Sequence, residues 1–283
     1  QIDEWRSSYM SQWPELLELQ LHDCADEHVD WRQIAQERVF PFLDERLLAM
    51  ETAHHSLLET CEPIYVRALE ALDLEFDLVC VIYVGIGCGA GWATQYLGSC
   101  AILFGLENIA ECGWQEPSSI AGLVAHELGH LAHYHLRAKC GKPMGDGPWW
   151  QLYGEGFARW CECEILGGAS PHDAAGINDA DYLLWCQNHR DWLSLEFLKD
   201  IDNTGTVRRF FGSWFDIGGR KQCGHYLGHE LIKELRATMS LREIALLDDI
   251  DGRFRHLTEK AAQSVPIDPH QLSPGRSTVS PHG

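Results

Sequence analysis

Two histidines and a glutamate in the order His-Glu-x-x-His are the clearest chemical signal in the sequence: His126, Glu127 and His130. On a helix, residues four positions apart lie on one face, so both imidazoles can bind the same metal ion. Glu127 follows His126 and is directed toward the open side of that ion, where its carboxylate can take a proton from metal-bound water. The pattern therefore predicts metal-assisted hydrolysis.

A hydrolytic zinc site keeps three protein ligands and one open position, so a third ligand must come from elsewhere in the chain. Metzincins place a glycine and a third histidine after the motif, but Ala132 and Leu136 stand at those positions here. His135 has the wrong spacing to be a ligand. His133 shares the face of His126, and we expect it to orient the site or to lie on the surface rather than to bind the metal.

The better candidate for the third ligand is Glu155, which is flanked by Gly154 and Gly156 and followed by Ala158. Two glycines inside a helix cost about 2 kcal/mol relative to alanine, which suggests that a neighbouring element must approach closely there. Two histidines with one carboxylate suit a single Zn²⁺ per chain, although the residue types alone leave manganese and cobalt open. The competing carboxylates are Glu162, Glu164 and Asp146.

The elements that must position these residues are two strands followed by long helices. Apolar, β-branched runs predict buried strands at 78–84 and 100–106, with a glycine-rich loop at 85–91 between them. The helix that carries the motif is expected to begin after Pro117 and to run to Gly141. A second helix is predicted from about 149 to 166.

The sequence pattern predicts that the remainder of the chain is mostly helical. A helical pattern covers 5–72, with a break expected at Pro41, and a last helical block begins near Gly224. We therefore expect a helix-rich α+β fold in which a small mixed sheet places an edge strand over the active-site helix. The expected divisions are an N-terminal helical segment (1–75), the sheet with the motif helix (76–142), a helical subdomain with the third ligand (143–264) and a loose tail (265–283).

Composition excludes several functional classes. The 283 residues are 45% hydrophobic and 23% charged, as in ordinary globular proteins, and the formal net charge is −20. Such an acidic chain argues against binding to nucleic acids and to anionic membranes, and no apolar run is long enough to span a bilayer. The aromatic residues between 185 and 215 are expected to be mainly core, with some lining the substrate cleft.

The number and spacing of the cysteines indicate in which cellular compartment the protein is expected to reside. The eleven cysteines are scattered without a Cys-x-x-Cys pair, so we interpret them as mostly reduced, buried thiols. With no signal-like segment after Gln1, we expect a cytoplasmic protein, although processing could produce the same start.

The motif and the segment Glu155-Gly156-Phe157-Ala158 together resemble the gluzincin clan of zinc metallopeptidases, which contains thermolysin-like enzymes and their aminopeptidase relatives. The resemblance covers about residues 78–166. It implies an edge strand lining a cleft, then the metal-binding helix, then a helical subdomain that supplies the third ligand.

Two shorter segments extend the resemblance. Glu107, in Phe104-Gly105-Leu106-Glu107-Asn108, is similar to the glutamate with which one zinc aminopeptidase family binds the free amine of its substrate, with leucine here in place of methionine. The segment from Gly224 to Gly228 resembles a helix start at which a Tyr or His hydrogen-bonds the oxyanion. His225 is the first candidate for that role and Tyr226 the second.

Together these features predict a zinc hydrolase that acts on a peptide or small amide. The expected class is a metallopeptidase, and an aminopeptidase is one form that it could take. Two alternatives stay open: hydrolysis of a non-peptide amide, and a catalytically degenerate, metal-stabilised binding protein. The oligomeric state is not predicted.

Overall fold

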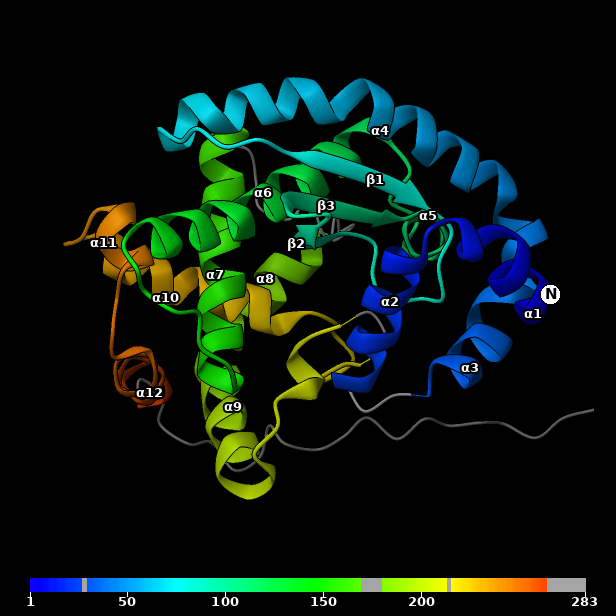
Figure 1. Ribbon diagram of the computed structural model, residues 1–283. Coiled ribbons are helices and arrows are strands. Elements are labelled where there is room, and N and C mark those ends of the chain that lie inside the picture. The colour runs from blue at the N-terminus through cyan, green and yellow to red at the C-terminus, as the bar shows by residue number, and fades with distance from the viewer. Residues whose placement is uncertain (27–29, 169–179, 213–214, 264–283) are drawn as a thin grey trace, which may run out of the picture.

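A computed structural model describes residues 1–26, 30–168, 180–212 and 215–263 of the chain (Figure 1). Within these residues the fold is mostly helical with one small mixed sheet, which confirms the predicted helix-rich α+β class. The predicted tail at 265–283 lies outside the described residues. No helix in the described part of the chain has the length and apolar character needed to cross a membrane.

The sheet has three strands: β1 (Val79–Tyr83), β2 (Trp92–Tyr96) and β3 (Ser99–Gly105). Strand β3 is central, parallel to β1 and antiparallel to β2. The prediction of strands near 78–84 and 100–106 is confirmed. Strand β2 was not among the predicted elements, and it is the edge strand nearest the motif helix.

The central strand buries alternate side chains on the two faces of the sheet, as the period of two residues requires. Ile102 and Phe104 pack against helices α4 (Leu43–Leu72) and α6 (Pro117–Lys139), and Figure 1 shows α4 arching over the sheet. Ala101 and Leu103 pack against the N-terminal segment. The sheet is therefore closed on both faces by helical layers.

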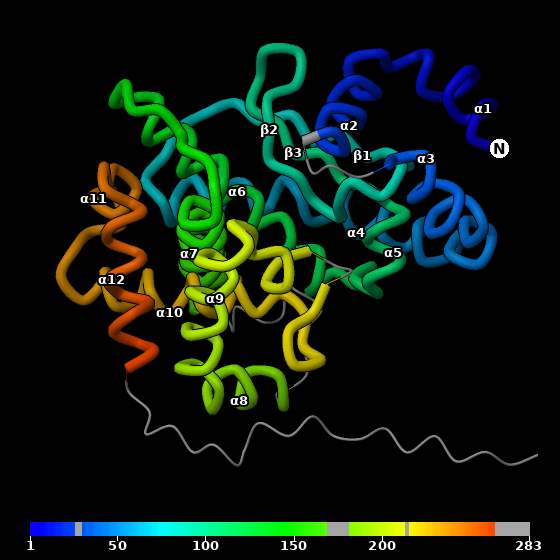
Figure 2. The backbone as a smooth tube through the Cα atoms, turned by 90° about the horizontal axis from the view of Figure 1, so that it is seen from below, coloured from blue at the N-terminus to red at the C-terminus, as the bar shows by residue number. Residues whose placement is uncertain are grey.

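The N-terminal layer consists of α1 (Ile2–Glu4), α2 (Pro14–Asp26) and α3 (Trp31–Ile34) with short helical turns between and after them. The turn Phe40–Phe42 contains Pro41 and separates this layer from α4, so the predicted break is confirmed. Figure 2 shows these first helices on the side of the molecule opposite the last ones.

The second half of the described chain is a group of helices packed around their own apolar core. Its helices are α7 (Pro148–Ile165), α8 (Ala180–Asn188), α9 (Arg190–Thr204), α10 (Cys223–Arg236), α11 (Leu241–Ala245) and α12 (Ile250–Ala262). The short helix α5 (Leu106–Cys112) follows β3 and packs in the core of the sheet layer. The predicted motif helix and the helix at 149–166 correspond to α6 and α7. Helix α7 lies between α6 and α10 and so joins the two parts of the fold.

Candidate metal centre

Helix α6 carries both motif histidines on its buried side. Pro117 occupies its first turn, where a missing N–H costs nothing, and the helix ends beyond His130 at Lys139. His126 is 9% exposed, so its imidazole must find its polar partners within the protein.

Small residues bring α7 close to both neighbouring helices. A Cβ atom added to Gly129 of α6 would lie 2.8 Å from the Cα of Ala158, and one added to Gly156 would lie 2.3 Å from the backbone carbon of Gly228 in α10. The prediction that glycine and alanine in this segment permit close approach is therefore confirmed for Gly156 and Ala158. A Cβ on Gly154 would meet nothing within 4 Å, because this residue borders a cavity.

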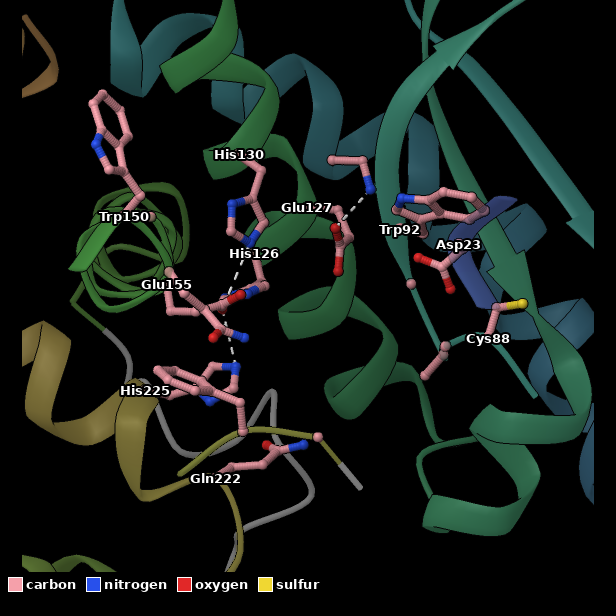
Figure 3. Close-up of a pocket in the computed structure, with 18 of the residues that line it drawn as sticks. Asp23, Cys88, Trp92, His126, Glu127, His130, Trp150, Glu155, Gln222 and His225 are labelled. Atoms are coloured by element: carbon pink, nitrogen blue, oxygen red, sulfur yellow. Dashed lines mark hydrogen bonds and ion pairs between the residues drawn. The ribbon is translucent and has the colours of Figure 1, made fainter. Parts of the chain in front are cut away.

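The close packing places Glu155 between α6 and α10 (Figure 3). Its Oε2 lies 3.1 Å from Nε2 of His126 and 3.6 Å from Nε2 of His130. On the other side the same oxygen lies 3.0 Å from Nε2 of His225. The ligand atoms of His126, His130 and Glu155 all lie within 4.8 Å of one another, so these three residues could hold one metal ion.

The ionisation of this group follows from its burial and its charges. Burial alone would raise the pKa of Glu155, but His225, His130 and His126 together hold it well below its usual range. Burial disfavours protonation of His126, yet its contacts with Glu155 and Glu162 raise its pKa to about 9. Two imidazole nitrogens and one carboxylate that stays ionised form a donor set that fits zinc.

A backbone group from the edge strand holds the proposed base. The N–H of Ala93 in β2 donates a hydrogen bond of 2.9 Å to Oε2 of Glu127. A Cβ on Gly91 would lie 2.9 Å from Cγ of Glu127, so only glycine leaves room for this side chain beside the strand. Burial raises the pKa of Glu127, and the neighbouring imidazoles of His130 and His126 partly offset that rise. A carboxylate with a raised pKa is suited to accept and return a proton.

A second carboxylate lies behind His126. Oε2 of Glu162 is 3.5 Å from Nδ1 of His126 and accepts a hydrogen bond of 2.6 Å from Arg159. Glu162 is one of the carboxylates that compete for the role of third ligand. It faces Nδ1 of His126, whereas Glu155 faces Nε2 of the same ring. Such a carboxylate fixes the ring orientation of a ligating histidine. The other competing carboxylates lie apart: Glu164 accepts from Trp160 near the surface, and Asp146 lies on the cavity wall.

No protein-family model, curated protein or solved structure matches this chain. What the chain shows by itself is a buried His-His-Glu group that could bind a metal ion.

The two candidates on α10 lie in different surroundings. His225 faces Glu155 and lines the cavity, and burial lowers its pKa against the attraction of Glu155. Tyr226 packs into the helical core, where burial raises the pKa of its hydroxyl. Of these two residues, only His225 is brought to the centre.

Glu107 is not among the residues that line the cavity. Its side chain is fully buried, and its two carboxylate oxygens accept hydrogen bonds from the backbone N–H groups of Gly85 and Gly87, at 2.9 and 3.1 Å. It therefore fixes the glycine-rich loop between β1 and β2, and burial raises its pKa.

The two additional histidines of α6 do not contact the centre as ligands. His133 is fully buried and stacks on Phe157, and burial lowers its pKa to about 3. His133 also lines the cavity, and the expectation that it lies on the surface is wrong because the residue is buried against α7. His135 lies against Phe76, away from the motif face.

The centre opens into a cavity of about 1060 Å³, the size expected for a pocket that takes a sizeable ligand. Tyr134, one turn beyond His130, and the rings of Trp92 and Trp150 form part of its wall. Of the aromatic residues between 185 and 215, Phe211 and Phe215 line the cavity. The others that the structure describes belong to the core or pack against it: Trp185, Trp192, Phe197 and Phe210.

Proposed function

We propose that this protein is a zinc-dependent hydrolase that cleaves peptide bonds. The observation that carries the proposal is the convergence of His126, His130 and Glu155 beside a buried Glu127 whose carboxylate is fixed by the edge strand. A site that only stabilises the fold needs no such oriented carboxylate, whereas a hydrolase needs a general base within reach of water.

Each residue of the centre has a distinct role in this proposal. His126, His130 and Glu155 would hold the zinc ion, which when bound acts as a Lewis acid that makes water more acidic and the substrate carbonyl more electrophilic. Glu127 accepts the proton of the attacking water and passes it to the leaving amine. His225 donates a hydrogen bond to the carbonyl oxygen as negative charge develops there.

The edge strand supports a peptide as the substrate. Backbone groups along the free edge of a sheet bind extended peptides by adding a strand. In β2 the N–H of Ala93 points away from β3 and toward the cavity, since it bonds Glu127 rather than the neighbouring strand. Because Glu107 is already engaged by the loop, we propose cleavage without a requirement for a free amino terminus.

The test compares three zinc-loaded proteins: the parent, Glu127→Gln, and Glu164→Gln as the control on the neighbouring helix. Each is incubated with a peptide library in free and N-acetylated forms and with a panel of non-peptide amides. We expect the parent and the control to cleave peptides of both forms, and Glu127→Gln to retain zinc but lose at least about 100-fold in rate.

Other outcomes would replace the proposal. Cleavage of amides alone would make the protein an amidohydrolase, and cleavage of free-amine peptides alone would restore an aminopeptidase. If the parent and Glu127→Gln bind zinc and are equally inert, the site belongs to a metal-stabilised binding protein.

A further inference from the structure

Two of the eleven cysteines, Cys24 and Cys88, lie with their thiols in contact. Sγ of Cys24 lies 3.7 Å from Sγ of Cys88, although the two residues are 64 positions apart in the chain. Only four of the eleven thiols are fully buried, so the expectation of mostly buried thiols is corrected.

The pair lies on the wall of the cavity opposite the metal centre. Cys24 belongs to α2 and Cys88 to the glycine-rich loop between β1 and β2, and both residues line the cavity. Figure 3 shows Cys88 beside Asp23 and Trp92, across from His126. Cys88 also hydrogen-bonds the carbonyl of Gln20, one turn before Cys24 on α2. The loop is thus already held against this helix by polar contacts of the thiol.

We propose that Cys24 and Cys88 form a disulfide that fastens the cavity loop to α2. A disulfide requires two sulfur atoms at about 2.05 Å, and rotation of the side chains can close the gap that remains. The inference does not depend on the proposed hydrolase function.

The oxidant is a small-molecule disulfide such as glutathione disulfide. The two thiols lose two protons and two electrons, and one protein S–S bond forms. The S–S bond of glutathione disulfide is reduced, giving two glutathione thiols. The hydrogen bond from Cys88 lowers the pKa of the Cys24 thiol, and this favours the thiolate needed for exchange.

A Cys24–Cys88 disulfide would act on the loop that leads into β2. That loop contains Gly91, which lies against Glu127, and it is followed by Ala93, whose N–H bonds the same carboxylate. Fixing the loop to α2 would therefore set the position of the strand edge beside the centre.

The test is a disulfide map of the full chain. The native protein is equilibrated with glutathione disulfide, its remaining thiols are alkylated in denaturant, and the digest is analysed without reduction by mass spectrometry. We expect linked peptides for 24–88 and a fall in free thiols from eleven to nine per chain. The exposed Cys140 provides the control, since Cys140→Ser should keep the link.

The variant Cys88→Ser should lose the 24–88 link and leave Cys24 open to alkylation. Because the parent map needs no variant, the proposal stays testable even if Cys88→Ser fails to fold. Alkylation of both Cys24 and Cys88 after equilibration, or linkage of either one to a different cysteine, would overturn it. A thermal melt gives a second measurement, since reduction should lower Tm in the parent more than in Cys88→Ser.

Discussion

The backbone N–H of Ala93 donates a hydrogen bond of 2.9 Å to the carboxylate of Glu127. This contact links the edge of the sheet to the residue that follows the first motif histidine. The orientation of the carboxylate is thereby set by a main-chain group, which has fewer alternative positions than a side chain.

Replacing Ala93 with proline removes this donor and leaves the ladder with β3 intact, because the lost N–H points away from β3. Without the hydrogen bond the pKa of Glu127 rises further, so the acid limb of kcat/KM should move to higher pH. We expect roughly a 10- to 100-fold loss of activity near neutral pH with metal content unchanged. Gln95→Pro, two positions along the same edge, is the control and should keep the parent profile.

Replacing Glu155 with alanine should abolish stoichiometric metal binding. About one zinc per chain is expected in the parent by elemental analysis, and less than a tenth of that in Glu155→Ala. Glu164→Ala, on the same helix and outside the centre, should bind as the parent does. Retention of zinc by Glu155→Ala would assign the third ligand to another carboxylate.

Replacing Glu162 with glutamine keeps the volume of the side chain but removes the charge that faces Nδ1 of His126. Loss of such an orienting partner typically weakens metal binding about 10- to 100-fold. Titration against a competing chelator measures this change. An unchanged affinity would mean that Glu162 serves only to neutralise Arg159, with which it forms a buried ion pair.

Two glycines of α7 should respond in opposite ways to alanine. Gly156→Ala forces a methyl group against Gly228 and should destabilise the protein by about 1–3 kcal/mol. Gly154→Ala meets open space and should stabilise the helix by about 1 kcal/mol. Denaturant unfolding measures both, and equal effects of the two substitutions would contradict the close helix contact.

The metal-free protein should lose stability as the solution becomes basic. The folded-state pKa of His126 is about 9, above the ordinary value of 6.5. Its contribution is therefore fully present below pH 6.5 and lost as pH rises through 9, a change of about 3 kcal/mol. Unfolding of the apoprotein between pH 6 and 10 tests this, and His126→Gln should remove the slope. A flat profile in the parent would contradict it.

The candidate ligand residues could be predicted from the sequence because a helix fixes the relation between positions four apart. His126 and His130 needed only that periodicity. Glu155 was indicated by glycines whose cost in a helix required a packing reason, and the contact of Gly156 with Gly228 supplies it. Local rules of this kind depend on the residue types alone.

The parts that escaped prediction depend on tertiary contacts. Strand β2 is only five residues long and follows a glycine-rich loop, so its Trp, Thr and Tyr did not by themselves mark a strand, and it pairs with β3 in the fold. The bond from Ala93 to Glu127 uses a backbone N–H, a group that every residue but proline carries, so no residue type marks it. The pairing of distant cysteines likewise appears only once the chain is folded.

The contact between Gly156 and Gly228 has a consequence for how precisely the centre is built. The carboxylate of Glu155 and the imidazole of His225 stand on helices that meet backbone to backbone, with no side chain between them. Such a contact has no rotamers to populate, so thermal motion has few ways to change the spacing of the helices. The spacing between Glu155 and His225 is therefore set by the main chain. This spacing should persist when the surrounding side chains are changed.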